Sequence, residues 1–184
     1  MARSDHALSR ARLAYERAHV MSALRGIALA GLLVAASISL HRTTDSTWFA
    51  ASGLAATLAT FGWRGGAWRR GSLAGVLAGI PVFVAPALYF LFTKGHCPSC
   101  AMAPTLPCML VCFGTSSAVG LAVGHVATRD TSPRRFAAGA ILGALLTGLL
   151  GCATTGIGGA AGIVVGLVAG GVTGWVVSSR HVAA

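Results

Sequence analysis

Long runs of apolar residues constrain the fold of this chain more than any other feature of its sequence. Only 10% of the 184 residues are charged and 55% are hydrophobic, whereas about a quarter of the residues in a soluble domain are charged. Residues beyond about position 25 therefore cannot form a water-facing surface, which indicates that lipid is their main solvent. Hydrocarbon offers no hydrogen-bond partners, so each segment must pair its own backbone groups, as an α-helix does. Continuous apolar runs, rather than alternating ones, favour helices over a transmembrane barrel.

The fold class predicted from these runs is all-α, a polytopic bundle of about six transmembrane helices with glycine-faced packing. A helix needs about 20 mostly apolar residues to cross a bilayer. The second segment is short, and the first contains Arg25, whose long side chain must reach toward the membrane surface. The predicted domains are a basic amphipathic segment at 1–19, a transmembrane domain at 20–178 and a short tail at 179–184. The six apolar segments span residues 20–40, 48–63, 73–92, 106–127, 136–153 and 157–178.

The positions of the basic residues predict how the chain is oriented. Short loops rich in Lys and Arg remain on the cytoplasmic side of a membrane. With six crossings, only Arg42 and Lys94 fall on the exterior side. We therefore expect a bacterial inner-membrane protein with both termini in the cytoplasm. The same topology accounts for the net charge of +10, so no direct binding of nucleic acid is expected. The basic residues assigned to the cytoplasmic side are Arg3, Arg10, Arg12, Arg17, Arg25, Arg64, Arg69, Arg70, Arg129, Arg134, Arg135 and Arg180.

The first 19 residues form a basic segment with an apolar stripe at helical spacing. One interpretation is a helix that lies on anionic lipid. The other is a docking helix for an acidic partner protein. The segment is too small to be an enzyme domain. The candidate partner-binding residues are Leu8, Arg10, Arg12, Tyr15 and Arg17.

Glycines recur every four residues in several of the apolar segments. A helix face without side chains lets two backbones approach closely, so that dispersion and Cα–H contacts hold the helices together. Packing within one chain is the simpler interpretation, and a homo-oligomer formed through the last segment is the alternative. The longest repeat, in the last segment, consists of Gly158, Gly162, Gly166, Gly170 and Gly174.

All five cysteines fall on the predicted exterior side of the membrane. Together with one histidine they allow three chemistries. Close thiolates and an imidazole can bind a soft metal ion such as zinc or copper. The Cys-Pro-Ser-Cys sequence has the form of a redox pair. The exterior of an inner membrane also permits structural disulfides. The candidate metal or redox residues are His96, Cys97, Cys100, Cys108, Cys112 and Cys152.

The second half of the chain, about residues 71–178, resembles the NrsF/CarR-like family of six-span integral-membrane anti-sigma factors. The resemblance rests on a cysteine near the start of the fourth segment (Cys108 or Cys112), the basic loop 131–135, the small-residue run 139–148 and Cys152. It implies a protein that sequesters an extracytoplasmic-function sigma factor in the cytoplasm. A metal, an oxidant or a related signal read outside would release that factor, with Cys112 and Cys152 as the matching sensor thiols. The chain departs from the family in its three extra exterior cysteines and in lacking a substantial acidic or zinc-binding cytoplasmic domain.

We therefore expect a non-enzymatic membrane sensor of the anti-sigma type. A membrane thiol-disulfide oxidoreductase or a heavy-metal-binding or uptake protein is the second interpretation. Uptake would require a thiol path that continues to cytoplasmic cysteines, and the predicted topology places none there. A structural membrane subunit, assembled through its glycine faces, is the third interpretation, and it predicts that all five cysteines are dispensable.

Overall fold

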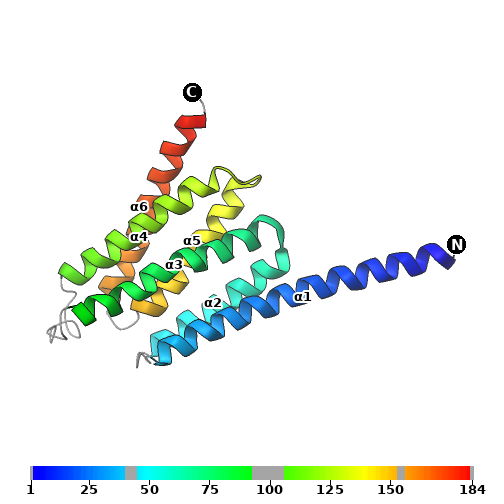
Figure 1. Cartoon of the computed structure of the whole chain (residues 1–184), viewed down its shortest axis with the longest axis horizontal. Coiled ribbons are helices and arrows are strands. Elements are labelled where there is room, and N and C mark those ends of the chain that lie inside the picture. Colours follow the sequence, from blue (N-terminus) through cyan, green and yellow to red (C-terminus); the bar gives the residue numbers. More distant parts are fainter. Residues whose placement is uncertain (1, 40–44, 93–105, 153–155, 183–184) are drawn as a thin grey trace.

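The computed structural model of the chain describes residues 2–39, 45–92, 106–152 and 156–182, and these form six α-helices without any β-strand (Figure 1). The all-α prediction is therefore confirmed for this part of the chain, and each of the six predicted apolar segments corresponds to one helix. The helices are α1 (Ala2–Ser39), α2 (Asp45–Arg64), α3 (Gly66–Phe92), α4 (Leu106–Ala127), α5 (Pro133–Cys152) and α6 (Gly156–Val182).

Four stretches within these helices are long and apolar enough to cross a membrane. They belong to α1, α4, α5 and α6, and they indicate that the protein is a membrane protein. Membrane crossing by α2 and α3, and with it the count of six spans, stays a prediction. The four stretches are Val20–Ser39, Met109–Ala127, Pro133–Gly151 and Gly158–Arg180.

Large apolar side chains point outward from the bundle, and small residues fill much of its interior. Phe49 is 79% exposed and Phe92 is 82% exposed, whereas Ala140 and Ala144 are fully buried. Serine and threonine are buried as well, and Ser116 donates its hydroxyl to the Cys112 carbonyl at 2.6 Å. A soluble protein rarely exposes apolar surface on this scale. The outward apolar surface thus indicates a bilayer environment, in which helices associate through small residues.

Helices α3 and α5 form a tightly packed parallel pair. A side chain at Gly75 would collide with the backbone of Ala140, and one at Gly143 would collide with the backbone of Ser72. On α3, Gly75 lies three residues after Ser72, the residue that faces Gly143. On α5, Gly143 likewise lies three residues after Ala140, the residue that faces Gly75. The two helices are therefore related by a local two-fold axis, and each supplies glycine where the other supplies a backbone carbonyl.

Helices α4 and α6 form a second parallel pair with the same arrangement. A side chain at Gly120 would lie 2.6 Å from the carbonyl oxygen of Leu167, and one at Gly170 would collide with the carbonyl of Ser117. The predicted glycine repeat of the last segment thus packs within the chain at Gly166, Gly170 and Gly174, each against the backbone of α4. These three glycines therefore face α4 of the same chain.

Helix α1 packs antiparallel to α2, with Gly26 against Leu58 and Gly62 against Ala23. It is continuous from Ala2 to Ser39, so the predicted cytoplasmic segment and the first predicted span are one helix. At about 1.5 Å per residue, the 38 residues extend about 57 Å, nearly twice the hydrocarbon thickness of a bilayer. Figure 1 shows the amino-terminal part of α1 extending well beyond the other helices.

Candidate functional site at the basic end of the bundle

The predicted cysteine site lies mostly outside the described residues. His96, Cys97 and Cys100 belong to the segment 93–105, whose structure is not described. Cys108 lies in the first turn of α4 and Cys152 is the last residue of α5, but only their backbone positions are described. Cys112 is 1% exposed and packs within the bundle near Gly162 of α6. These helix positions share one end of the bundle, as the topology predicts.

No cluster of three metal-binding side chains occurs among the described residues. A metal site or a disulfide at the cysteines therefore stays a prediction. The predicted partner-binding residues Leu8, Arg10, Arg12, Tyr15 and Arg17 all lie on α1, in its projecting part. Of these, the structure describes the side chain of Arg17 alone, and it is exposed. Their role stays a prediction too.

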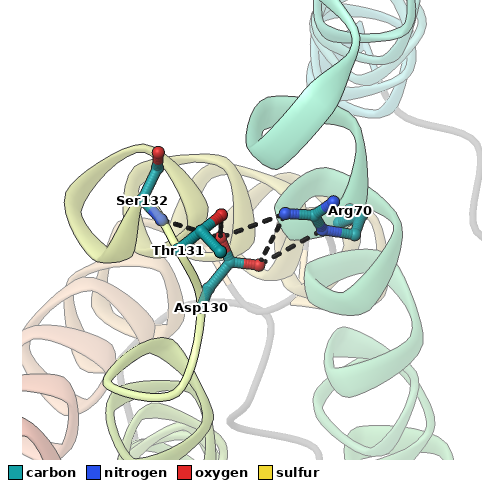
Figure 2. A network of polar contacts seen from close by, with 4 residues as sticks. All are labelled: Arg70, Asp130, Thr131 and Ser132. Atoms are coloured by element: carbon teal, nitrogen blue, oxygen red, sulfur yellow. Dashed lines mark hydrogen bonds and ion pairs between the residues drawn. The ribbon is translucent and has the colours of Figure 1, made fainter.

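The opposite end of the bundle carries a polar network centred on Asp130, in the turn between α4 and α5 (Figure 2). Arg70, near the start of α3, donates to this carboxylate from Nε at 3.2 Å and from Nη2 at 3.0 Å. The backbone N–H of Ser132 donates to Oδ1 at 3.0 Å, and the Thr131 hydroxyl donates to the same oxygen at 3.3 Å. A forked guanidinium contact of this kind fixes orientation as well as distance. The network therefore fastens the start of α3 to the α4–α5 turn.

The environment of Asp130 stabilises its charged form. The hydrogen bond from the Ser132 backbone lowers the pKa of the carboxyl group most, partial burial opposes this, and the hydrogen bond and charge of Arg70 lower it further. The carboxyl side chain is 12% exposed and Arg70 is 55% exposed, so solvent screens the pair from one side. Asp130 is thus ionised at neutral pH and neutralises Arg70.

A second polar contact joins α4 to α6 at the same end. His125 Nδ1 lies 2.6 Å from the buried hydroxyl of Ser178, and His125 Nε2 lies 2.9 Å from Nη2 of Arg129. Arginine donates only, so Nε2 must accept and the imidazole proton must lie on Nδ1. Nδ1–H then donates to Ser178. The imidazole accordingly bridges the ends of two helices.

A cavity of about 430 Å³ opens between α1, α2 and α3 at this basic end. Arg25 of α1 and Arg69 of α3 supply its charge, and no acidic residue lines it. Arg69 Nη1 donates to the Ser22 hydroxyl at 3.5 Å, which is a long hydrogen bond. Apolar walls complete the space, which we name the Arg25–Arg69 cavity. Its lining is Met21, Ser22, Arg25, Gly26, Leu58, Gly62, Arg69, Ser72 and Leu73.

The chemistry that Arg25 and Arg69 offer at this end is the binding of anions. The guanidinium groups of Arg25 and Arg69 each offer several N–H donors and no acceptor. The neighbouring basic side chains have partners within the chain, because Arg70 pairs with Asp130 and the Arg64 guanidinium lies 5.9 Å from the ring centroid of Trp68. Arg25 and Arg69 therefore supply the positive charge of the cavity.

The sequence identified Arg25 as a charge within an apolar segment, but it did not indicate that Arg69 lines the same cavity. It also gave no indication that Asp130 binds Arg70 or that Ser178 contacts His125. The signal for Asp130 was present, since it is one of four acidic residues in the chain and precedes the Thr-Ser-Pro start of α5. No sequence pattern links Ser22 to Arg69, which are 47 positions apart.

Comparison with known proteins gives no relative on which to base an assignment. No protein-family model, no curated protein and no solved structure matches the chain. The resemblance to membrane anti-sigma factors is therefore neither supported nor contradicted by these comparisons. The function must be inferred from the physical features of this chain.

Proposed function

We propose that this chain is a non-enzymatic, integral-membrane sensor of the anti-sigma type, which holds a cytoplasmic sigma factor through the projecting part of α1. The observation that carries the proposal is the continuity of α1 from Ala2 to Ser39. A single helix joins a basic, outward-reaching segment to an apolar stretch packed against α2. Displacement of that stretch is therefore transmitted to the segment without an intervening hinge.

The packing of α1 gives this transmission a physical basis. Gly26 and Gly62 bring the backbones of α1 and α2 together, since a side chain at Gly26 would meet the Leu58 Cβ at 3.0 Å. Tightly packed helices have discrete arrangements rather than a continuous range, so a change elsewhere in the bundle shifts α1 between positions. Metal binding or disulfide formation at the predicted exterior cysteines would bias this equilibrium.

The partner is tested by purifying the tagged full-length protein from its native membranes. We expect an extracytoplasmic-function sigma factor to co-purify, and a reporter driven by the promoter of that factor to be repressed. If no sigma factor is enriched over an unrelated tagged membrane protein, the proposed partner is wrong.

The coupling is tested by a helix break between the two parts of α1. Val20→Pro removes one helical hydrogen bond and places the proline ring against the carbonyl of Glu16. Val20→Leu preserves the helix and is the matched control, because Val20 is exposed. We expect the proline variant to lose its response to cadmium or peroxide in the reporter assay, and the leucine variant to retain it. A proline variant that responds normally excludes a rigid α1 as the transmitting element.

The sensor residues are tested by replacing Cys112 and Cys152 with serine. Induction of the reporter by cadmium or peroxide should be lost while repression persists, because the partner-binding helix is untouched. Full induction in the double variant would exclude these two thiols as the sensor.

A further inference from the structure

The Arg25–Arg69 cavity brings two positive charges together in a space with apolar walls. Ser22 and Arg25 are three positions apart on α1, and Arg69, Ser72 and Leu73 have the same type of spacing on α3. Residues three or four apart share one helix face, so two helix faces meet across the cavity, with Leu58 and Gly62 of α2 beside them. Each of the three helices contributes to one continuous lining.

The depth of the cavity in a membrane follows from the position of Arg25. This residue lies five positions inside the apolar stretch Val20–Ser39, or about 7.5 Å along the helix axis. A positive charge at that depth is costly unless it reaches the interface or meets a negative group. Among the described residues, Arg25 makes no hydrogen bond or ion pair with another side chain. A negative group from outside the chain would offset this charge.

We infer that the Arg25–Arg69 cavity binds the phosphate of an anionic phospholipid, with the headgroup in the cavity and the acyl chains along the exposed apolar surface of α1 and α3. Guanidinium groups bind phosphate through parallel N–H···O bonds. The hydroxyl of Ser22 adds a polar group beside them. Exposed Met21, Leu24 and Leu73 supply apolar surface next to the cavity for the glycerol backbone and the acyl chains. Basic pockets between membrane helices are recognised sites for anionic headgroups.

Charge and composition favour a lipid over an acidic protein segment as the occupant. The volume of about 430 Å³ falls in the range of about 300–1,000 Å³ that is typical of small-molecule pockets. Part of the lining belongs to an apolar membrane stretch, where phospholipid is the abundant anion. Binding here would join α1 to α3 through a common ligand. This inference does not depend on the identity of the cytoplasmic partner.

The test is native mass spectrometry of the full-length protein in detergent with equal amounts of phosphatidylglycerol and phosphatidylcholine. The wild type should retain phosphatidylglycerol preferentially. Each basic residue contributes about 1 kcal/mol to the binding of an anionic lipid, and about 1.4 kcal/mol corresponds to a tenfold change in affinity. The double variant Arg25→Gln, Arg69→Gln should therefore lose roughly 25-fold of the preference for phosphatidylglycerol. The single variant Arg69→Gln, with one charge removed, should lose about fivefold.

The matched control removes the same charge elsewhere. Arg134→Gln with Arg135→Gln changes two exposed arginines at the start of α5 and should leave the preference unchanged. Equal losses in both double variants would show that diffuse surface charge holds the lipid and would overturn the inference. Circular dichroism of each variant confirms that the helices persist, and the single variant provides the test if the double variant does not fold.

Two additional arms distinguish the source of the anion. Glycerol phosphate at millimolar concentration should fail to displace phosphatidylglycerol, because it lacks acyl chains; complete displacement would show a site for free phosphates instead. If the Arg25→Gln, Arg69→Gln variant retained phosphatidylglycerol normally but no longer captured a protein partner, the cavity would bind an acidic protein segment, and the lipid inference would be wrong.

Discussion

Gly75→Ala tests whether the close approach of α3 and α5 holds the centre of the bundle together. The added Cβ would collide with the carbonyl oxygen of Ala140 and lie 2.6 Å from its Cα. That distance is 0.8 Å below the 3.4 Å at which ordinary van der Waals contact begins. Both neighbouring atoms belong to the backbone of α5, so neither can rotate away. The two helices must therefore move apart.

The size of the effect follows from two opposing contributions. Alanine is intrinsically more favourable than glycine within a helix by about 1 kcal/mol. Forcing an extra methyl group into a tightly packed interface costs about 1–3 kcal/mol. A gap of about 0.5–1 Å also removes a quarter to a half of the dispersion energy of each contact along the pair. The overpacking cost is thus the larger contribution at Gly75.

Gly31→Ala is the matched control, because a Cβ at Gly31 on α1 would have no neighbour within 4 Å. The Gly31→Ala variant gains the higher helix propensity of alanine without a collision against another helix. The free energy of unfolding should therefore be lower for Gly75→Ala than for Gly31→Ala by about 2 kcal/mol, which is the middle of the overpacking range. Reversible unfolding in mixed micelles with increasing dodecyl sulfate, followed by circular dichroism, measures this difference. Equal unfolding free energies in the two variants would refute close packing at Gly75.

Two further predictions concern the basic end of the bundle. The pKa of Asp130 is lowered in the folded protein from its ordinary value of 3.8. The stabilising contribution of this carboxylate is therefore present above that value and is lost as the pH falls through the lowered pKa of the folded protein. Thermal unfolding in detergent should therefore lose less stability between pH 7 and pH 3 in Asp130→Asn than in the wild type; an identical loss would contradict this. Ser178→Ala removes the hydrogen-bond partner of His125 and should lower the free energy of unfolding by about 1 kcal/mol, and unchanged unfolding in micelles would show that the contact contributes nothing.

The helices could be predicted from the sequence because membrane insertion leaves a strong local signal. A run of about 20 apolar residues is nearly sufficient to define a helix in lipid, and the predicted segment 106–127 coincides with α4 (Leu106–Ala127). Helix starts with polar residues were harder to predict. Helix α5 begins at Pro133, before the predicted 136, because proline at the first helical position and two arginines continue the helix into the polar turn.

The sequence could not predict which helices pack together, because a glycine face does not identify the helix that it contacts. The third, fourth, fifth and sixth segments all contain four-residue spacings of small residues, so several pairings satisfy the pattern equally well. The structure selects α3 with α5 and α4 with α6, and both pairs are parallel. In each of these pairs one helix lies between the two partners in the sequence, so the partners are not consecutive helices. A sequence pattern read one segment at a time contains no such information.

The different contacts of Arg69 and Arg70 could not be predicted from the sequence either. The two arginines are adjacent, and a count of basic residues does not distinguish them. Consecutive residues point in directions about 100° apart around a helix, since one turn takes about 3.6 residues. Arg70 accordingly reaches Asp130 in the α4–α5 turn, whereas Arg69 reaches Ser22 on α1 and the cavity beside it. The two arginines therefore have separate structural effects: Arg70 fastens α3 to the α4–α5 turn, and Arg69 places a positive charge beside α1. Because α1 also carries the projecting segment, an anion bound at Arg25 and Arg69 would restrain the helix proposed to bind the cytoplasmic partner.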